Sequence, residues 1–191
     1  MPVEPVTDIK DLPPLHFTGE ILLVDHPEAL EAAVAELRRA PVLGFDTETR
    51  PSFRKGEKHL PSLIQLAQEN RVHLIQLKRT GFTPALADLL SDAAVAKAGV
   101  GVRDDIKALV EMRPFEPAGF ADLAEFARAR AIPERGLRSL TARFLGRRLS
   151  KGAQTSNWAA RELTERQKRY AAADAWVCWR LYHMLHTPPP A

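Results

Sequence analysis

The stretch that most constrains this chain is Val42-Leu43-Gly44-Phe45-Asp46-Thr47-Glu48, a short apolar run that leads directly into two acids. Such a run predicts a strand that is buried on both faces of a sheet. Because side chains alternate along a strand, Asp46 and Glu48 point to the same side. Two neighbouring acids at the end of a buried strand repel each other and are costly to desolvate, so we expect a divalent cation to offset them. Taken alone, the pair also fits a strand that ends in an acidic turn.

Length and composition limit the class of protein. The chain has 191 residues, of which 45% are hydrophobic and 27% charged, as expected for one globular domain with its own core. No apolar run reaches the roughly 18–20 residues of a membrane span, and the acidic N-terminus lacks the order of a signal peptide. Cys178 is the single cysteine, which excludes an internal disulfide and a multi-cysteine zinc site. We therefore expect a cytoplasmic protein without a membrane segment.

The order of the predicted elements indicates an α/β fold, with a mixed sheet and helices on its faces. We expect residues 1–19 to be a flexible leader, 20–186 a folded domain and 187–191 a disordered tail. The first helix is expected to start at Asp25 as N-cap, with Glu28 completing a capping box. The predicted strands are Glu20–Val24, Val42–Asp46, the hairpin pair Ser62–Gln68 and Arg71–Leu77, and Val95–Val102; the other predicted helices are Thr83–Leu90, Arg103–Met112, Ala121–Arg130, Leu137–Leu145 and Thr164–His186.

A further acidic pair, Asp104-Asp105, follows a predicted strand and opens a helix. Strand ends of this kind are where α/β proteins place ligands. Adjacent helix positions point about 100° apart, so only one of the two acids faces the site. We favour Asp105, because Leu109 lies one turn later on the same side and anchors it inward. Asp104 is then an N-terminal acid that complements the helix dipole, and the same role for both acids is the alternative.

The last candidate acid is Asp174, which lies four residues after Tyr170 in a long helix. Residues at this spacing share one helix face. The three alanines between them leave that face flat, so another layer can approach closely. A buried Asp without a neighbouring base is costly, which favours a metal ligand. An Asp that caps a neighbouring loop, with Tyr170 as a core residue, is an equally good interpretation of this pair alone.

Together these motifs resemble the three exonuclease motifs of the DEDD superfamily, tyrosine subclass. Asp46-Thr47-Glu48, Asp105 and Tyr170-x-x-x-Asp174 have the order and spacing of that family, and no histidine stands just ahead of Asp174. The resemblance extends over about residues 20–186. Within the superfamily, the sequence is similar to the branch of ribonuclease D and the Werner-syndrome exonuclease, and more so to the Werner type. The segments that carry it are PSLIQLA, AGVGVRDDIKAL and TSNWAARELTERQKRYAAADAW.

The resemblance implies a ribonuclease H-like fold and a metal-dependent 3′–5′ exonuclease that releases nucleoside 5′-monophosphates from DNA or RNA. It implies two cations held by Asp46, Glu48, Asp105 and Asp174, and an all-oxygen ligand set suits Mg²⁺ or Mn²⁺. Tyr170, with an ordinary pKa of about 10, is expected to orient the attacking water and not to act as a base. A catalytically silent nucleic-acid-binding or scaffolding module on the same fold is the alternative, and the presence of all four acids and the tyrosine favours an enzyme.

Two basic loops, residues 49–61 and 147–157, are the candidates for holding a strand with a single-stranded or recessed 3′ end. Solvated surface loops are the competing interpretation. The chain carries a net charge of +3, and withdrawing four acids into one site would leave a more basic surface for a polyanion. From position, the substrate-binding candidates are Thr47, Arg54, Lys55, Lys58, Arg147, Arg148 and Lys151.

Overall fold

The computed structural model describes residues 8–52, 54 and 56–186, and these form a mixed sheet of six strands in the order β1-β4-β3-β2-β5-β6. β1 is parallel to β4, and β5 is parallel to β2 and β6, whereas β3 is antiparallel to both β2 and β4. The strands are β1 (Glu20–Val24), β2 (Val42–Thr49), β3 (Pro61–Ala67), β4 (Arg71–Gln76), β5 (Ala96–Gly99) and β6 (Phe120–Asp122).

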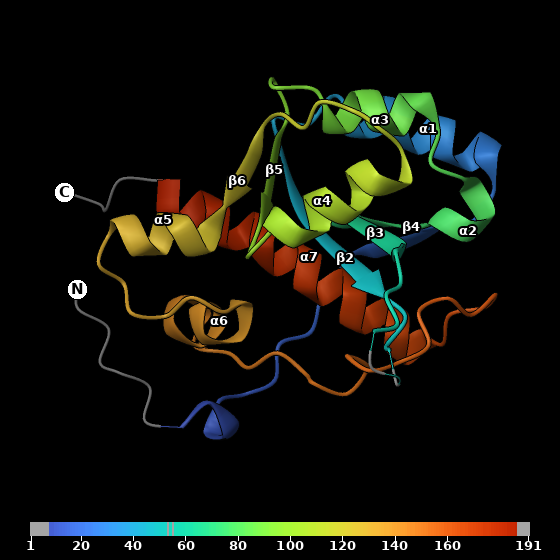
Figure 1. Ribbon diagram of the computed structural model, residues 1–191. Helices are drawn as coiled ribbons and strands as arrows, with labels where there is room; N and C mark the ends of the chain where they lie inside the picture. Colours follow the sequence, from blue (N-terminus) through green and yellow to red (C-terminus); the bar gives the residue numbers. More distant parts are fainter. Residues whose placement is uncertain (1–7, 53, 55, 187–191) are drawn as a thin grey trace.

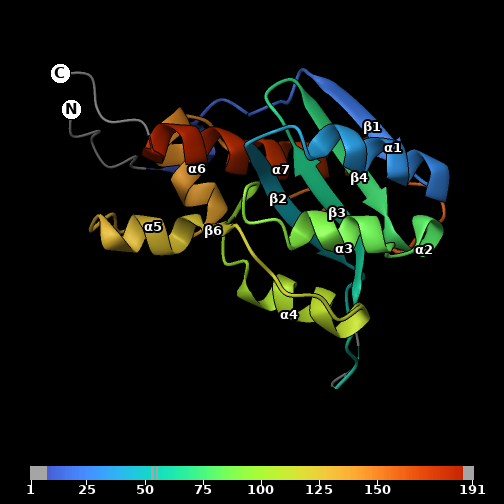
Figure 2. The same ribbon diagram turned by 90° about the horizontal axis from the view of Figure 1, so that it is seen from above.

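Helices cover both faces of this sheet, which confirms the predicted α/β fold (Figures 1 and 2). The long helix α7 crosses one face, with α5 and α6 packed along it, and α1 and α3 lie side by side on the other face. None of the described helices is both long and apolar enough to cross a membrane. The helices are α1 (Pro27–Leu37), α2 (Leu77–Thr80), α3 (Pro84–Leu90), α4 (Arg103–Met112), α5 (Leu123–Ala129), α6 (Leu137–Leu145) and α7 (Glu165–His186).

The backbone of α7 rests almost directly on β2. Gly44 shares one strand face with Asp46 and Glu48, and a Cβ added to it would lie 2.0 Å from the carbonyl oxygen of Ala175. The facing residues of α7, Ala171–Ala175, are all buried. The flat alanine surface predicted from the sequence is therefore confirmed. It allows the backbone of α7 to pack directly against the backbone of β2 at Gly44.

Two short elements within the expected domain 20–186 were not predicted. The segment Phe120–Asp122, expected as the approach and first turn of a helix, is strand β6, because its backbone pairs in parallel with β5. The turn Leu77–Thr80, expected to end a strand, is the helix α2. β2 also continues beyond Asp46 to Thr49, because β3 keeps pairing with it.

The N-terminal caps of two helices were predicted from the sequence, one correctly and one wrongly. The predicted capping box at the start of α7 is present, since Thr164 Oγ1 accepts from the Gln167 amide at 3.2 Å and Gln167 Oε1 accepts from the Thr164 amide at 3.0 Å. The predicted cap of α1 is wrong, because the N-cap is His26 and its side chain makes no capping bond. The carboxylate of Asp25 is instead held by Arg79 at 2.9 Å.

The described part of the expected leader has defined contacts. Ile9–Asp11 form a short 3-10 helix. The amide of Leu15 donates to the carbonyl of Arg148 at 2.9 Å, and the Arg148 amide donates to the carbonyl of Pro13 at 3.0 Å. Phe17 packs against α7. Prolines remove backbone donors but keep their carbonyls as acceptors, so this segment still forms a wall beside α7. Residues 1–7 and the expected tail 187–191 lie outside the described residues.

Candidate active site

β2 carries two carboxylates past the point where its neighbour ends. β5 pairs with β2 only as far as Gly44, so Asp46 and Glu48 extend beyond the carboxyl end of β5. On the other side β3 keeps β2 extended through Thr49. Both acids are half-buried and face α7. The sheet therefore fixes the backbone under both side chains, which is where open α/β sheets place their ligands.

α7 supplies the third carboxylate. Asp174 is 7% exposed, and one oxygen each of Asp46, Glu48 and Asp174 lie within 4.8 Å of one another. Tyr170 lies one turn earlier on α7, packs against Trp158 with ring centroids 5.9 Å apart, and donates a hydrogen bond to Asp174. Strand and helix thus bring together residues separated by more than a hundred positions in the sequence.

Asp105 lies next to this cluster but is not part of the group of three. It sits in the first turn of α4, where its carboxylate accepts a hydrogen bond from Thr47 Oγ1. Thr47 points to the opposite face of β2 from Asp46 and Glu48. Its hydrogen bond to Asp105 therefore connects α4 to β2 between the two acids. Asp104 is exposed, as expected for the acid that faces away.

Burial and mutual repulsion dominate the electrostatics of the cluster. Burial, followed by the charges of Asp174 and Asp105, raises the pKa of Asp46 well above its usual range. Burial, and next the charge of Asp46, raises the pKa of Glu48 to about 9. Burial raises the pKa of Asp174 to about 7, although the Tyr170 hydrogen bond and the charge of Arg138 oppose the shift. Such raised pKa values mean that the ionised cluster lacks counter-charge.

This donor set fits divalent metal ions. Several carboxylate oxygens at mutual distances below 5 Å, with no cysteine or histidine among them, match the ligand preference of hard cations. A bound cation would reverse the repulsion that raises the pKa values. The cluster has the chemistry of a metal centre, with its ligands supplied by one strand and one helix.

Tyr170 remains protonated at neutral pH. Burial, followed by the charges of Asp174 and Glu48, raises its pKa well above the ordinary value. A phenol in this state donates a hydrogen bond and cannot take up a proton. The geometry therefore suits the predicted orienting role of the hydroxyl and does not suit a general base.

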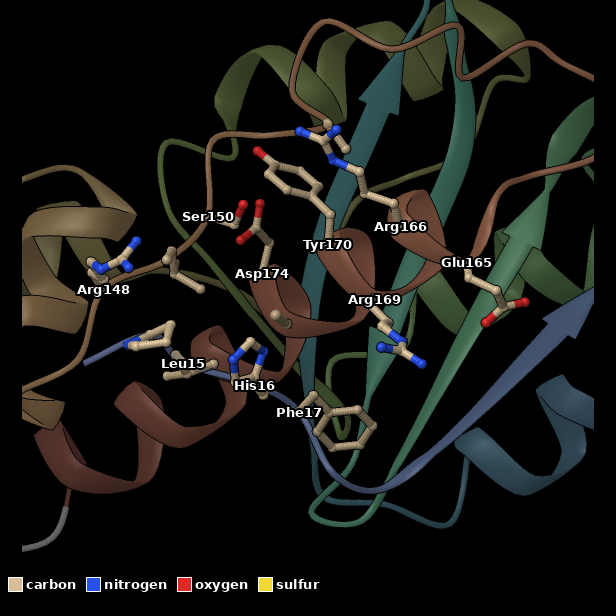
Figure 3. Close-up of a pocket in the computed structure, with 14 residues that line it drawn as sticks. Leu15, His16, Phe17, Arg148, Ser150, Glu165, Arg166, Arg169, Tyr170 and Asp174 are labelled. Carbon is tan, nitrogen blue, oxygen red and sulfur yellow. The ribbon is translucent and has the colours of Figure 1, made fainter. Parts of the chain in front are cut away.

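A cavity of about 530 Å³ opens in front of Tyr170 and Asp174 (Figure 3). The leader segment at His16 and Phe17 forms one wall, and Arg166 of α7 stands near the tyrosine ring. The sequence interpretation missed this wall and the arginines Arg166 and Arg169 of α7, but it named Arg148. Arg166 stands four residues, about one helical turn, before Tyr170, a spacing that could have indicated it. The remaining basic lining residues are Arg148 and Arg169.

The other predicted substrate-binding residues are exposed or line different cavities. Arg54 and Lys58 are exposed in the loop after β2, and Lys58 lines a separate cavity of about 320 Å³. Lys151 lines a cavity that also reaches Tyr170 and Asp174. Lys55 lies outside the described residues.

Comparison with known proteins identifies the family. Residues 21–187 match the family described as 3′–5′ exonuclease, and the chain belongs to it. A 3′–5′ exonuclease of Arabidopsis thaliana is 27% identical, over 95% of this chain and 69% of that protein. Ribonuclease D of Haemophilus influenzae is 32% identical, over 94% of this chain and 44% of the relative. The mouse bifunctional 3′–5′ exonuclease/ATP-dependent helicase WRN is 30% identical, over 92% of this chain and 13% of the relative.

Solved structures show the same fold. The Nibbler EXO domain of Aedes aegypti aligns with a TM-score of 0.78 at 27% identity and covers 86% of both chains. Ribonuclease D of Trypanosoma brucei, solved in complex with RNA U12, aligns with a TM-score of 0.81 at 24% identity, over 91% of this chain and 64% of that chain. The chain spans less than half the length of the Haemophilus influenzae ribonuclease D and of mouse WRN.

The raised pKa values predict how stability depends on pH and metal. Because the folded cluster binds more protons than the unfolded chain, the unfolding temperature of the metal-free protein should fall as pH rises from about 5 to about 9. Mg²⁺ or Mn²⁺ should restore more stability at pH about 8.5 than at pH about 5.5. At roughly 100 times Kd, binding contributes about 2.7 kcal/mol, or about 5–10 °C for a chain of this size.

Thermal unfolding followed by circular dichroism checks this expectation. Asp46→Asn should flatten the pH dependence and remove the metal-induced rise. Glu31→Gln, which changes an exposed acid of α1, the helix on the sheet face opposite α7, should keep both. An unfolding temperature that does not change with pH, or an equal metal effect in Asp46→Asn, would contradict the interpretation.

Proposed function

We propose that this chain is a metal-dependent exonuclease that hydrolyses phosphodiester bonds from the 3′ end of DNA or RNA and releases nucleoside 5′-monophosphates. One observation carries the proposal: Asp46, Glu48 and Asp174 gather within 4.8 Å of one another, with Tyr170 hydrogen-bonded to Asp174, in a chain of the 3′–5′ exonuclease family. The substrate is a nucleic acid with a single-stranded or recessed 3′ end. The chain acts in the cytoplasm, in keeping with its single, buried Cys178.

The acids would hold two ions, Mg²⁺ or Mn²⁺. Asp46, Glu48 and Asp174 would bind one ion, and Asp46 with Asp105 the other. When bound, the ions would lower the pKa of the attacking water and neutralise charge on the phosphate and on the leaving 3′ oxygen. Thr47 holds Asp105 by a hydrogen bond, so it fixes the direction from which that carboxylate reaches the site.

Tyr170 would position the attacking water. Its hydroxyl already donates to Asp174, and the ring is held against Trp158. Because its one O–H is donated to Asp174, the phenol oxygen would accept a hydrogen bond from the attacking water and so hold the water oxygen in line with the phosphorus atom. The tyrosine itself gives up no proton in this step.

The strand would be held by basic residues around the site. We assign this role to residues of the two basic loops and of β2 on the basis of their places in the sequence. Among those that the structure describes, Arg54, Lys58 and Lys151 are exposed. The ribonuclease D of Trypanosoma brucei that shares this fold was solved with RNA, which supports a nucleic acid as partner. The proposed substrate-binding residues are Thr47, Arg54, Lys55, Lys58 and Lys151.

A degradation assay tests the activity. End-labelled DNA and RNA, single-stranded and with recessed ends, are incubated with Mg²⁺ and with Mn²⁺. We expect a ladder that shortens from the 3′ end and is abolished by EDTA. Asp46→Ala purified in parallel controls for contaminating nuclease. Binding of the oligonucleotides without cleavage of any substrate would instead identify a silent binding module.

The two kinds of site residue should differ in their effect on rate. Asp46→Ala and Asp174→Ala remove proposed ligands, and a loss of several kcal/mol of transition-state stabilisation corresponds to about 10³-fold or more in kcat. Tyr170→Phe removes one hydrogen bond and should cost about 10- to 100-fold. Metal-saturated single-turnover kinetics measure the difference. An equal loss in all three variants would rule out a positioning role for Tyr170.

A further inference from the structure

Arg138 lies in the first turn of α6, on the wall of a second cavity beside the cluster. This cavity has a volume of about 710 Å³ and is also lined by Tyr170 and Asp174. The arginine therefore faces the same space as the proposed reaction centre, although it comes from a helix that carries none of the predicted acids.

The guanidinium of Arg138 has a buried donor that the described part of the chain does not satisfy. Its Nε atom is buried and has no hydrogen-bond partner within the part of the chain that the structure describes. Arg143, five residues later on the same helix, shows the contrast, because it pairs with Glu134 at 3.2 Å and lies over the Phe144 ring. A buried donor without an acceptor is costly. The donor is satisfied if an acceptor enters the cavity.

The surroundings of Arg138 favour an anionic acceptor. Lys10 and Lys151 line the same cavity. Gly136 is the N-cap of α6 and offers no side-chain cap, so the first amides of the helix add partial positive charge. Asp8 also lines the cavity, but its carboxylate accepts from the Lys10 amide at 2.9 Å. The charge of Arg138 reaches Asp174, which places the arginine at the rim of the cluster.

We propose that Arg138 binds a phosphate of the substrate strand next to the scissile one. The guanidinium presents several N–H donors in a planar fork that matches two phosphate oxygens. The scissile phosphate belongs to the carboxylate cluster and its ions, so the anion in this cavity is a neighbouring phosphate of the same strand. This assignment rests on the proposed exonuclease function. A purely structural role, as counter-charge to Asp174, is the alternative.

A set of modified oligonucleotides tests the contact. One uncharged methylphosphonate replaces, in turn, each of the three linkages on the 5′ side of the scissile bond. In the parent we expect kcat/KM to fall about 10- to 100-fold at one of these linkages. With the unmodified oligonucleotide, Arg138→Gln should already have a kcat/KM that is lower by the same factor. A methylphosphonate at the sensitive linkage should then cause no further fall in kcat/KM of Arg138→Gln. Arg138→Lys keeps the charge without the fork and should fall between the two.

Arg39→Gln is the matched control. Arg39 is exposed and follows α1 in the sequence. Helix α1 lies on the sheet face opposite α7 (Figure 2), so this variant should behave as the parent does with every oligonucleotide. Arg138→Gln should also keep the parent's unfolding temperature. The contact is overturned if Arg138→Gln loses as much as the parent at every modified linkage, which is the additive result expected of a counter-charge to Asp174.

Binding measured in parallel separates this inference from the proposed function. Fluorescence anisotropy with the same strands in EDTA should show the same non-additivity in Kd. If that pattern holds but no strand is cleaved with either metal, the exonuclease proposal fails and the phosphate contact stands. If the strands are cleaved but affinities in Arg138→Gln and parent respond alike to every methylphosphonate, the phosphate contact fails and the exonuclease stands.

Discussion

Mutual repulsion among the carboxylates of Asp46, Glu48 and Asp174 is the constraint on which this structure depends. The three groups are held within 4.8 Å of one another, and burial raises all three pKa values. A fold tolerates such a cluster only if its framework is stiff enough to hold the groups together. The contact of α7 with Gly44 supplies that stiffness, because strand and helix meet backbone to backbone. The same repulsion makes the site a strong attractor for cations.

The groups around the cluster follow from this arrangement. Thr47 points to the opposite face of β2 from Asp46 and Glu48, and its hydroxyl donates a hydrogen bond to Asp105. The end of β2 therefore positions acids on both faces of the sheet. Burial, followed by the charges of Asp174 and Glu48, raises the pKa of Tyr170, so the hydroxyl stays protonated and remains a hydrogen-bond donor. Further out, basic residues from α6, α7 and the leader surround two cavities that meet at Tyr170 and Asp174. The acidic centre suits bound cations, and the basic residues around it suit the phosphates of a nucleic acid.

The sequence predicted the parts of this site that local patterns determine. The apolar run before Asp46 and the four-residue spacing of Tyr170 and Asp174 each follow from the period of one element, and the structure places these side chains together. Their roles as ligands and as a positioning group stay predictions. β6 has three residues and exists only through pairing with β5, so no local pattern indicates it. The cap of α1, the packing of the leader on α7 and the cavity at Arg138 likewise depend on contacts between distant segments.

The proposed role of the carboxylate cluster requires a metal ion to bind between Asp46, Glu48 and Asp174, and crystallography can locate such an ion. Crystals of the protein soaked in Mn²⁺ would be measured at a wavelength that gives anomalous scattering from manganese. We expect an anomalous peak among the carboxylate oxygens of Asp46, Glu48 and Asp174 that disappears in Asp46→Asn. Absence of a peak there, at a Mn²⁺ concentration that saturates any metal effect on unfolding, would contradict it.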